Sequence, residues 1–571
     1  MSELNIWNDS FSDIQAPTAT GKPLMNGIAP PPLIPPLPRP WAQADDEIWV
    51  DLSDATIHDP TTNAKCWQAI VRNNWNSEMN APILFNYESS IVYVERNDKG
   101  LPLIRQLTPD FLSNKLSGWV NWCRGVKALA TPPMRSIRDV MATFEGYKHL
   151  PTLTRIVSIP VFSSAGKLQT TPGYNRESGV LYLPPAGFEA LPVPATITPE
   201  ILEAAKAALA EVLIDFPFTS KGDETHAYAL AFLPVVRDMI DGPTPNHVIE
   251  ASKNGSGKDL LARALLGISI GTINATADPV EEVEMRKVIT SFALFGKQVF
   301  YLANVNRKLD SASLAAAIAD QNWADRPLGR TAMLEMIIRM IWVTTGTNMQ
   351  LHREHARRGL RCRLTPSAPH PELRPRESYK HPDLLDYVLE NRPRLLQAIH
   401  IICKHAIDQG LPRQRQILGT FEKWSHVIGS ILACAGYPDF LANAREFQAA
   451  AAQDTNSHAS FCAAWFADAE KLKATSPDPL HRAGKFKTSE LLGIARNIEG
   501  MPITGRSERA QMTSLGMYLA AHHQDPVAWP DEDPDSPYLE HVFQLEENGV
   551  SKGSRLWSIF KTDSIKKPDM Q

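Results

Sequence analysis

The stretch His247–Leu265 limits the fold more than any other part of the chain. An apolar pair at Val248 and Ile249 comes first, a polar loop with Gly255 and Gly257 follows, and leucines at helical spacing come next. This pattern predicts a strand, a loop and a helix in immediate succession. Small residues before a helix let backbone N–H groups close around an anion, and the helix dipole adds partial positive charge.

The same loop predicts a phosphate site of the P-loop type. That pattern is G-x-x-x-x-G-K-[ST], and here Ser252 holds the position of the first glycine. Asp259 replaces the hydroxyl residue that would bind Mg²⁺. ATP is the expected ligand, and the residues predicted to surround it are Ser252, Asn254, Gly255, Ser256, Gly257, Lys258 and Asp259.

Composition excludes several classes of protein. No apolar run approaches the ~20 residues that span a bilayer, and the N-terminus lacks the apolar core of a signal peptide. Six scattered cysteines without a C-x-x-C pair predict reduced thiols and a cytoplasmic location. The net charge of −5 means that nucleic-acid binding has to come from local basic patches.

Five regions follow from composition and periodicity. Residues 1–44 are predicted to be a disordered tail, and the polyproline II segment Pro30–Pro40 is either a stiff linker or a binding site for a partner protein. Residues 45–195 are predicted to be mixed α and β. Residues 196–385 are predicted to be a P-loop domain, because apolar strands such as 298–303 and 338–344 alternate with helices. Residues 386–475 are predicted to be helical.

The last region, 476–571, has a different pattern. Helices are predicted at Glu490–Ile498 and Arg509–Ala521, and a β-hairpin is predicted from the strands His541–Leu545 and Arg555–Phe560. Helices followed by a hairpin are the order of a winged helix-turn-helix. A basic region lies earlier in the chain, since residues 351–380 carry eight basic and three acidic side chains, a net charge of +5.

With these pieces in order, the chain resembles the helicase halves of phage, plasmid and integrative-element primase–helicases. These are ring ATPases related to superfamily III and AAA+ proteins. The resemblance spans about residues 48–560, and its main segments are 150–184, 242–265, 299–329, 341–364, 380–396 and 418–436. It implies an AAA+-like parallel-sheet core, a homo-oligomer such as a hexameric ring, and DNA as a partner.

The resemblance also implies roles for single residues. Lys258 corresponds to the lysine that grips phosphate, and Asn348 to the polar sensor residue. Arg357 and Arg358 stand where the family has its arginine finger, which reaches the nucleotide of a neighbouring subunit. The Walker B strand of the family ends in an aspartate, but this chain has Ala303 there.

Two positions that handle the metal have therefore changed together. Mg²⁺ needs hard oxygen ligands, Ala303 offers none, and Asp259 places a negative charge beside the phosphates. One interpretation is that nucleotide binds but is hydrolysed poorly. The other is that Asp259 replaces the missing strand carboxylate as the metal ligand.

Three functions remain open at this point. The first is an ATP-dependent ring helicase of a mobile genetic element. The second is a non-hydrolysing oligomeric scaffold that keeps the fold for DNA or partner binding. The third is a regulatory subunit that works with an intact ATPase.

Overall fold

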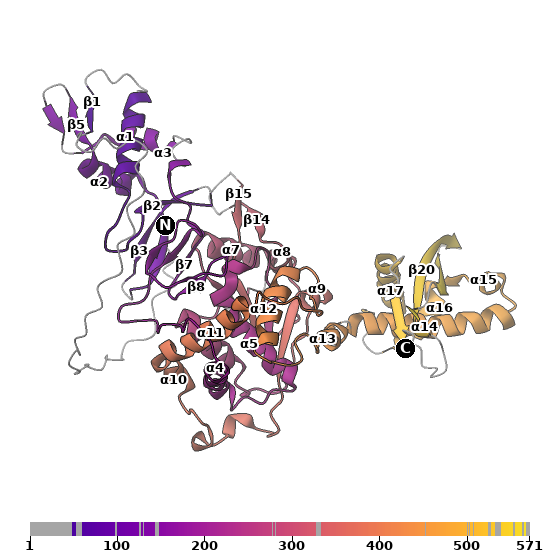
Figure 1. Cartoon of the computed structure of the whole chain (residues 1–571). Coiled ribbons are helices and arrows are strands. Elements are labelled where there is room, and N and C mark those ends of the chain that lie inside the picture. Colours follow the sequence, from indigo (N-terminus) through magenta and orange to yellow (C-terminus); the bar gives the residue numbers. More distant parts are fainter. Residues whose placement is uncertain are drawn as a thin grey trace. The chain divides into compact units, whose positions relative to one another are not determined.

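The computed structural model describes residues 48–566, with short gaps. These gaps are 53–59, 89, 98–99, 125–126, 130, 143–147, 277, 280, 327–332, 452, 499–500, 502, 506, 524–526, 531–537, 552–553 and 562–564. The predicted proline-rich tail, 1–44, and its candidate partner-binding segment lie outside the described residues. Figure 1 colours the chain along its sequence.

The first described region mixes helices with small sheets, as predicted. One sheet is antiparallel, in the order β2-β3-β4, and a second has the order β1-β5-β6 with β1 parallel to β5. Thr108 caps the helix that begins at Pro109, because its hydroxyl accepts a hydrogen bond from the Phe111 N–H. The elements are β1 (Trp49–Asp51), α1 (Pro60–Asn73), β2 (Leu84–Tyr87), β3 (Ser90–Arg96), β4 (Pro102–Gln106), α2 (Pro109–Trp119), β5 (Asn121–Arg124), β6 (Lys127–Leu129) and α3 (Met134–Ala142).

Short strands follow and contribute to the main hydrophobic core. Val157, Phe162 and Tyr182 are buried in the same apolar cluster as the helices and strands of the P-loop region. The strand β11 pairs in parallel with β7 and antiparallel with β10, and β8 pairs with β9. Their bounds are β7 (Arg155–Val157), β8 (Val161–Phe162), β9 (Leu168–Gln169), β10 (Gly173–Tyr174) and β11 (Val180–Tyr182).

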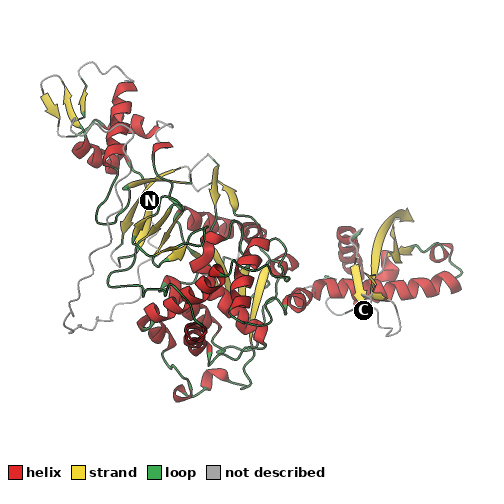
Figure 2. Cartoon of the chain, in the orientation of Figure 1, coloured by secondary structure: helices red, strands yellow, loops and turns green. Residues whose placement is uncertain are grey.

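A parallel four-stranded sheet in the order β13-β16-β12-β17 forms the centre of the P-loop region. Figure 2 shows strands in yellow among the helices of this region. Every residue of β12 is buried, as expected for an inner parallel strand covered on both faces. The strands are β12 (Asn246–Ala251), β13 (Val299–Val305), β16 (Ile341–Thr347) and β17 (Gly359–Leu364).

The strand β17 was not predicted, because its arginines made residues 351–380 read as a basic surface. In the structure Arg361 is buried, with its guanidinium 2.9 Å from Glu446 and 3.9 Å from Asp223. Arg363 lies 3.5 Å from Glu250. Ion pairs therefore compensate these charges and allow a charged segment to form a sheet strand.

Helices surround the sheet. The helix before the P-loop strand begins at Lys221, where the Ser220 hydroxyl caps it, and a 3₁₀ turn follows its end at Val236. A hairpin of β14 (Asn322–Asp325) and β15 (Leu334–Ile337) was also not predicted. The helices are α4 (Pro199–Leu213), α5 (Lys221–Val236), α6 (Lys258–Ile270), α7 (Glu282–Leu294), α8 (Ala312–Ala319), α9 (Arg353–Arg357), α10 (Leu384–Glu390), α11 (Arg392–Asp408), α12 (Glu422–Cys434) and α13 (Ala444–Ala451).

The last region has its own apolar cluster, which includes Trp465, Phe486, Leu519 and Trp557. Both predicted helices and the predicted hairpin are present, but the hairpin strands extend through most of the segment expected to be a loop. The short strand β18 joins the hairpin by pairing with β21. The elements are α14 (Gln453–Thr475), α15 (Pro479–Arg482), β18 (Phe486–Lys487), α16 (Thr488–Arg496), α17 (Glu508–His522), β19 (Val527–Pro530), β20 (Tyr538–Ser551), β21 (Ser554–Lys561) and β22 (Ile565–Lys566).

The chain is thus α/β, with a parallel core sheet. Among the described helices, none combines the length and the apolar character needed to cross a membrane.

Candidate nucleotide site

The loop between β12 and α6 depends on two glycines. Gly255 has φ +73° and Gly257 has φ +82°, in the left-handed region that L side chains rarely adopt. The loop starts after Ala251, and α6 begins at Lys258. The predicted order of strand, glycine loop and helix is confirmed.

The segment that follows β17 lies directly against this loop. A Cβ placed on Gly255 would come within 2.7 Å of the Glu372 Cβ and 3.0 Å of its backbone nitrogen. The Lys253 ammonium donates a hydrogen bond of 2.9 Å to the Ala368 carbonyl. On the other side, a Cβ on Gly257 would lie 3.1 Å from the Phe216 ring. Packing and φ therefore both require glycine at position 255, whereas at position 257 the φ value requires it and the Phe216 ring leaves little room for a Cβ.

Lys258 lies at the first position of α6 and is buried, with 8% of its surface exposed. Its ammonium is 3.6 Å from the Asp259 Oδ2. The charge that the sequence assigns to phosphate binding therefore has a carboxylate beside it.

The Asp259 carboxylate is held by hydroxyl groups from two strands. Its Oδ1 accepts a hydrogen bond of 2.7 Å from the Tyr301 hydroxyl on β13 and one of 2.6 Å from the Thr345 hydroxyl on β16. Burial, together with the hydrogen bond to Asp259 and the charge of that residue, raises the pKa of Tyr301 well above its usual value. The tyrosine therefore keeps its proton and remains a donor to Asp259.

No carboxylate stands at the end of β13. Ala303 is half-buried, and Asn304 follows it with φ +54°. The Asn304 N–H donates to the Thr345 hydroxyl over 3.1 Å, so Thr345 connects the strand end to Asp259. Asp259 is thus an acidic group that is bound to β13 and β16 at this edge of the sheet.

The remaining predicted residues of this site lie at the same edge. The Asn348 side-chain amide donates to the Ser252 carbonyl over 3.2 Å, and the Thr347 hydroxyl donates to the Asn254 side chain over 2.8 Å. The Ser256 hydroxyl donates to the Lys253 carbonyl. The Ser252 hydroxyl is buried and has no hydrogen-bond partner among the described residues.

Arg357 and Arg358 lie at the opposite end of the sheet. The Arg358 carbonyl accepts a hydrogen bond from the Asn246 N–H, where β12 begins, whereas the P-loop follows the end of β12. A strand of this length covers about 20 Å. Both guanidiniums contact Glu354, at 3.0 Å and 2.8 Å. One chain therefore does not bring these arginines to its own P-loop.

Sequence reasoning missed Tyr301 and Thr345, which fix Asp259. A tyrosine within a buried strand indicates a hydroxyl that needs a hydrogen-bond partner. Which residue is that partner depends on how β13 packs against α6. Another cluster, Asp478, His481 and Glu490, has ligand atoms within 4.8 Å of one another. Asp478 and Glu490 accept hydrogen bonds from the Leu480 and Lys487 N–H groups and so cap α15 and α16. Their structural role accounts for this grouping.

Comparison with known proteins does not show the family of this chain. No family model and no curated protein sequence matches this chain. Among solved structures, the apo A form of the C-terminal region of NrS-1 has a TM-score of 0.32 and 12% identity, covering 82% of this chain and 96% of that one. The JCV helicase with a bound acetamide compound has a TM-score of 0.19 and 14% identity, covering 41% and 67%. TM-scores this low carry no argument about function.

Proposed function

We propose that this chain is a helicase-like P-loop protein that binds ATP at Lys258 and hydrolyses it weakly or not at all. It acts as an oligomeric scaffold on DNA, for which it keeps an AAA+ or superfamily III fold of the mobile-element type. The loop of Gly255 and Gly257, followed directly by α6, supports nucleotide binding.

A single arrangement supports impaired hydrolysis. The end of β13 has Ala303 in place of a carboxylate residue. The Asp259 Oδ1 already accepts hydrogen bonds from the hydroxyls of Tyr301 and Thr345. Phosphoryl transfer relies on positioned charge and metal ions. A carboxylate tied to two protein hydroxyls has less freedom to coordinate a Mg²⁺ ion.

One observation favours the active alternative. The Asp259 Oδ2 takes no part in the hydrogen bonds to Tyr301 and Thr345, and lies 3.6 Å from the Lys258 ammonium. Two donors on Oδ1 would fix the carboxylate so that Oδ2 faces a metal held with the phosphates. In that case Asp259 replaces the missing strand aspartate, and the protein is an ATP-driven motor.

The C-terminal region supports nucleic-acid association. Its elements follow in the order α14, α15, β18, α16, α17, β19, β20 and β21, and β18 pairs with β21. Apart from α15 and β19, this order resembles that of a winged helix. We propose that α17 and the hairpin contact DNA. Two basic residues lie at or near the turn of this hairpin: the Arg555 side chain is 3.6 Å from Glu547, and Lys552 lies outside the described residues.

The experiment measures ATP hydrolysis with and without single-stranded DNA. The variant Ala303→Asp/Asp259→Thr should exceed the wild type by about a hundredfold or more, the size of one preorganised electrostatic contact to a transition state. Asp259→Thr alone is the matched control and should stay at the wild-type rate, because the strand would still lack its oxygen.

The opposite result is equally clear. A wild-type rate of about 1 s⁻¹ or more would rule out the scaffold. Asp259→Ala should then abolish activity, which would identify Asp259 as the substitute metal ligand.

A further inference from the structure

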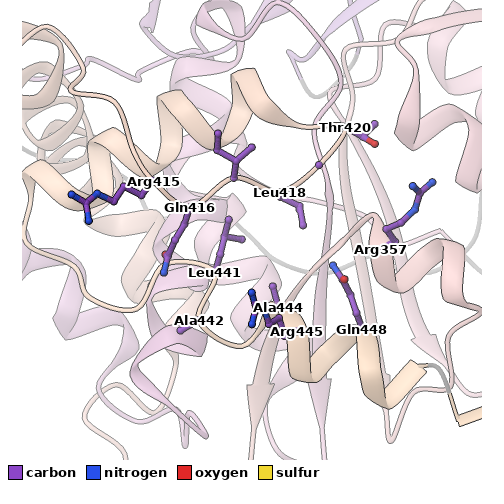
Figure 3. Close-up of a pocket in the computed structure, with 12 residues that line it drawn as sticks. Arg357, Arg415, Gln416, Leu418, Thr420, Leu441, Ala442, Ala444, Arg445 and Gln448 are labelled. Atoms are coloured by element: carbon purple, nitrogen blue, oxygen red, sulfur yellow. The ribbon is translucent and has the colours of Figure 1, made fainter. Parts of the chain in front are cut away.

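A cavity of about 770 Å³ lies beside α9, away from the P-loop. Three separate segments line it: the end of α9, the loop 415–420 between α11 and α12, and the start of α13 with the residues before it. Figure 3 shows Arg357, Arg415 and Arg445 contributed by these three segments. Its volume falls within the range of ordinary small-molecule sites, about 300–1,000 Å³.

The charged residues of the lining are all basic. It includes three arginines and no acidic residue. Glu354 pairs with Arg357 from outside the lining. Neither Arg415 nor Arg445 has an ion pair with any side chain in the described part of the chain. By contrast, Arg361 on β17 is buried and has acidic partners.

The other lining groups suit a phosphate-bearing molecule with a flat apolar part. Gln416, Gln448 and Thr420 bring further hydrogen-bond donors. Leu418 is buried and Leu441 is half-buried, so the cavity also has an apolar surface. A second cavity of about 460 Å³ shares Arg415 and Gln416 with the first, and its lining adds the basic Arg413 and the acidic Asp439.

We propose that this arginine cavity, lined by Arg357, Arg415 and Arg445, binds the phosphates of a nucleotide unit, either free or within a single-stranded nucleic acid. Guanidinium groups form paired hydrogen bonds to phosphate oxygens. The base would lie against Leu418 and Leu441. The site is distinct from the P-loop, because Arg358, which adjoins α9, is bonded to the start of β12 and the P-loop follows its end.

The test uses the full chain with Lys258→Ala, which weakens binding at the P-loop. Two probes are titrated by fluorescence: an ATP analogue with a fluorescent ribose, and a labelled fifteen-nucleotide oligothymidylate. Adding Arg415→Ala/Arg445→Ala should weaken binding of at least one probe by about a hundredfold, since each charge-assisted contact accounts for about tenfold or more.

Two further variants separate a built site from general charge. Arg138→Ala/Arg176→Ala removes the same charge from exposed positions outside the cavity and should change affinity by less than about threefold. Arg415→Lys/Arg445→Lys keeps the charge but loses the planar guanidinium that forms paired hydrogen bonds, so this variant should bind the probes with intermediate affinity. Thermal unfolding of each variant checks that it is folded.

The outcomes identify the ligand. Loss confined to the ATP analogue assigns the cavity to a free nucleotide, and loss confined to the oligonucleotide assigns it to a nucleic-acid strand. Affinity equal to that of the Arg138/Arg176 control for both probes would overturn the proposal, as would lack of binding of either probe to the Lys258→Ala protein. Nucleotide binding by the P-loop is judged separately, by comparing the wild type with Lys258→Ala.

Discussion

The two ends of the core sheet differ in whether their polar side chains have partners within the protein. At the P-loop end, Asp259, Tyr301 and Thr345 bind one another, and Asn348 and Thr347 bond to the loop. Around α9, Arg415 and Arg445 line an open cavity and pair with no acid in the described part of the chain. The same sheet thus has one end where most of these polar groups bind one another, the buried Ser252 hydroxyl excepted, and another end where charge is left without a partner.

This contrast separates groups that stabilise the fold from groups that are available to a ligand. Removing a partner from a satisfied buried cluster leaves donors unpaired, which costs about 1–3 kcal/mol each. Removing an exposed arginine without an ion pair costs little stability. Mutations in the bonded cluster at the P-loop end should therefore mainly lower stability. Mutations in the arginine cavity should mainly weaken ligand binding.

The largest expected effect on stability is at the P-loop end. Asp259→Ala should lower the free energy of unfolding by about 2–4 kcal/mol, because the hydroxyls of Tyr301 and Thr345 lose their shared acceptor. Denaturant unfolding measures this. Asp259→Asn keeps an acceptor oxygen and should lose less than half as much. Equal stability of wild type and Asp259→Ala would mean that water replaces the carboxylate and that this end is not internally satisfied.

The next effect is on binding. Lys258→Ala should weaken ATP binding by about 1.5–3 kcal/mol, the value of a hydrogen bond to a charged group. Calorimetric titration of both proteins measures this. The Lys258 ammonium lies 3.6 Å from the Asp259 carboxylate, which is longer than a hydrogen bond. The variant should therefore unfold near the wild-type midpoint. Unchanged ATP affinity would show that the loop is not a phosphate site.

A third effect concerns the arginine end and pH. His247, the second residue of β12, is buried, and burial together with the charge of His226 lowers its pKa from 6.5 to about 3. A histidine whose pKa is lowered by folding stabilises the fold fully above its unfolded pKa and loses that contribution as the pH falls. From pH 7.5 to pH 5 this one group should cost about 2 kcal/mol.

His247→Leu removes that titration, so its thermal midpoint should fall less than that of the wild type between the two pH values. The exposed His370→Leu is the matched control and should follow the wild type. An identical fall in all three proteins would mean that His247 stays neutral in the unfolded chain or titrates normally in the folded one.

The smallest effect on stability is expected at the arginine cavity. Arg415→Ala/Arg445→Ala should shift the free energy of unfolding by no more than about 0.5 kcal/mol. Relief of repulsion between like charges would make the sign favourable. A loss of several kcal/mol in denaturant unfolding would place these arginines in the structural framework and remove the contrast between the two ends.

The sequence by itself determined the local elements that carry the P-loop. Residues 246–270 form strand, loop and helix because apolar spacing and the conformational freedom of Gly255 and Gly257 act over a few residues. The parallel sheet was predictable for the same reason, since buried strands alternate with helices. The domain boundaries and the nucleotide role of the site residues stay predictions.

Only the tertiary structure decided which groups meet. Asp259 finds Tyr301 and Thr345 across 42 and 86 residues of chain, and the arginine cavity joins Arg357 to residues far along the chain. The strand β17 could not be predicted from the sequence because the acidic residues that neutralise Arg361 come from α5 and α13. Local patterns act through neighbouring residues, whereas the charge and hydrogen-bond balance of a side chain depends on distant segments that packing alone brings together.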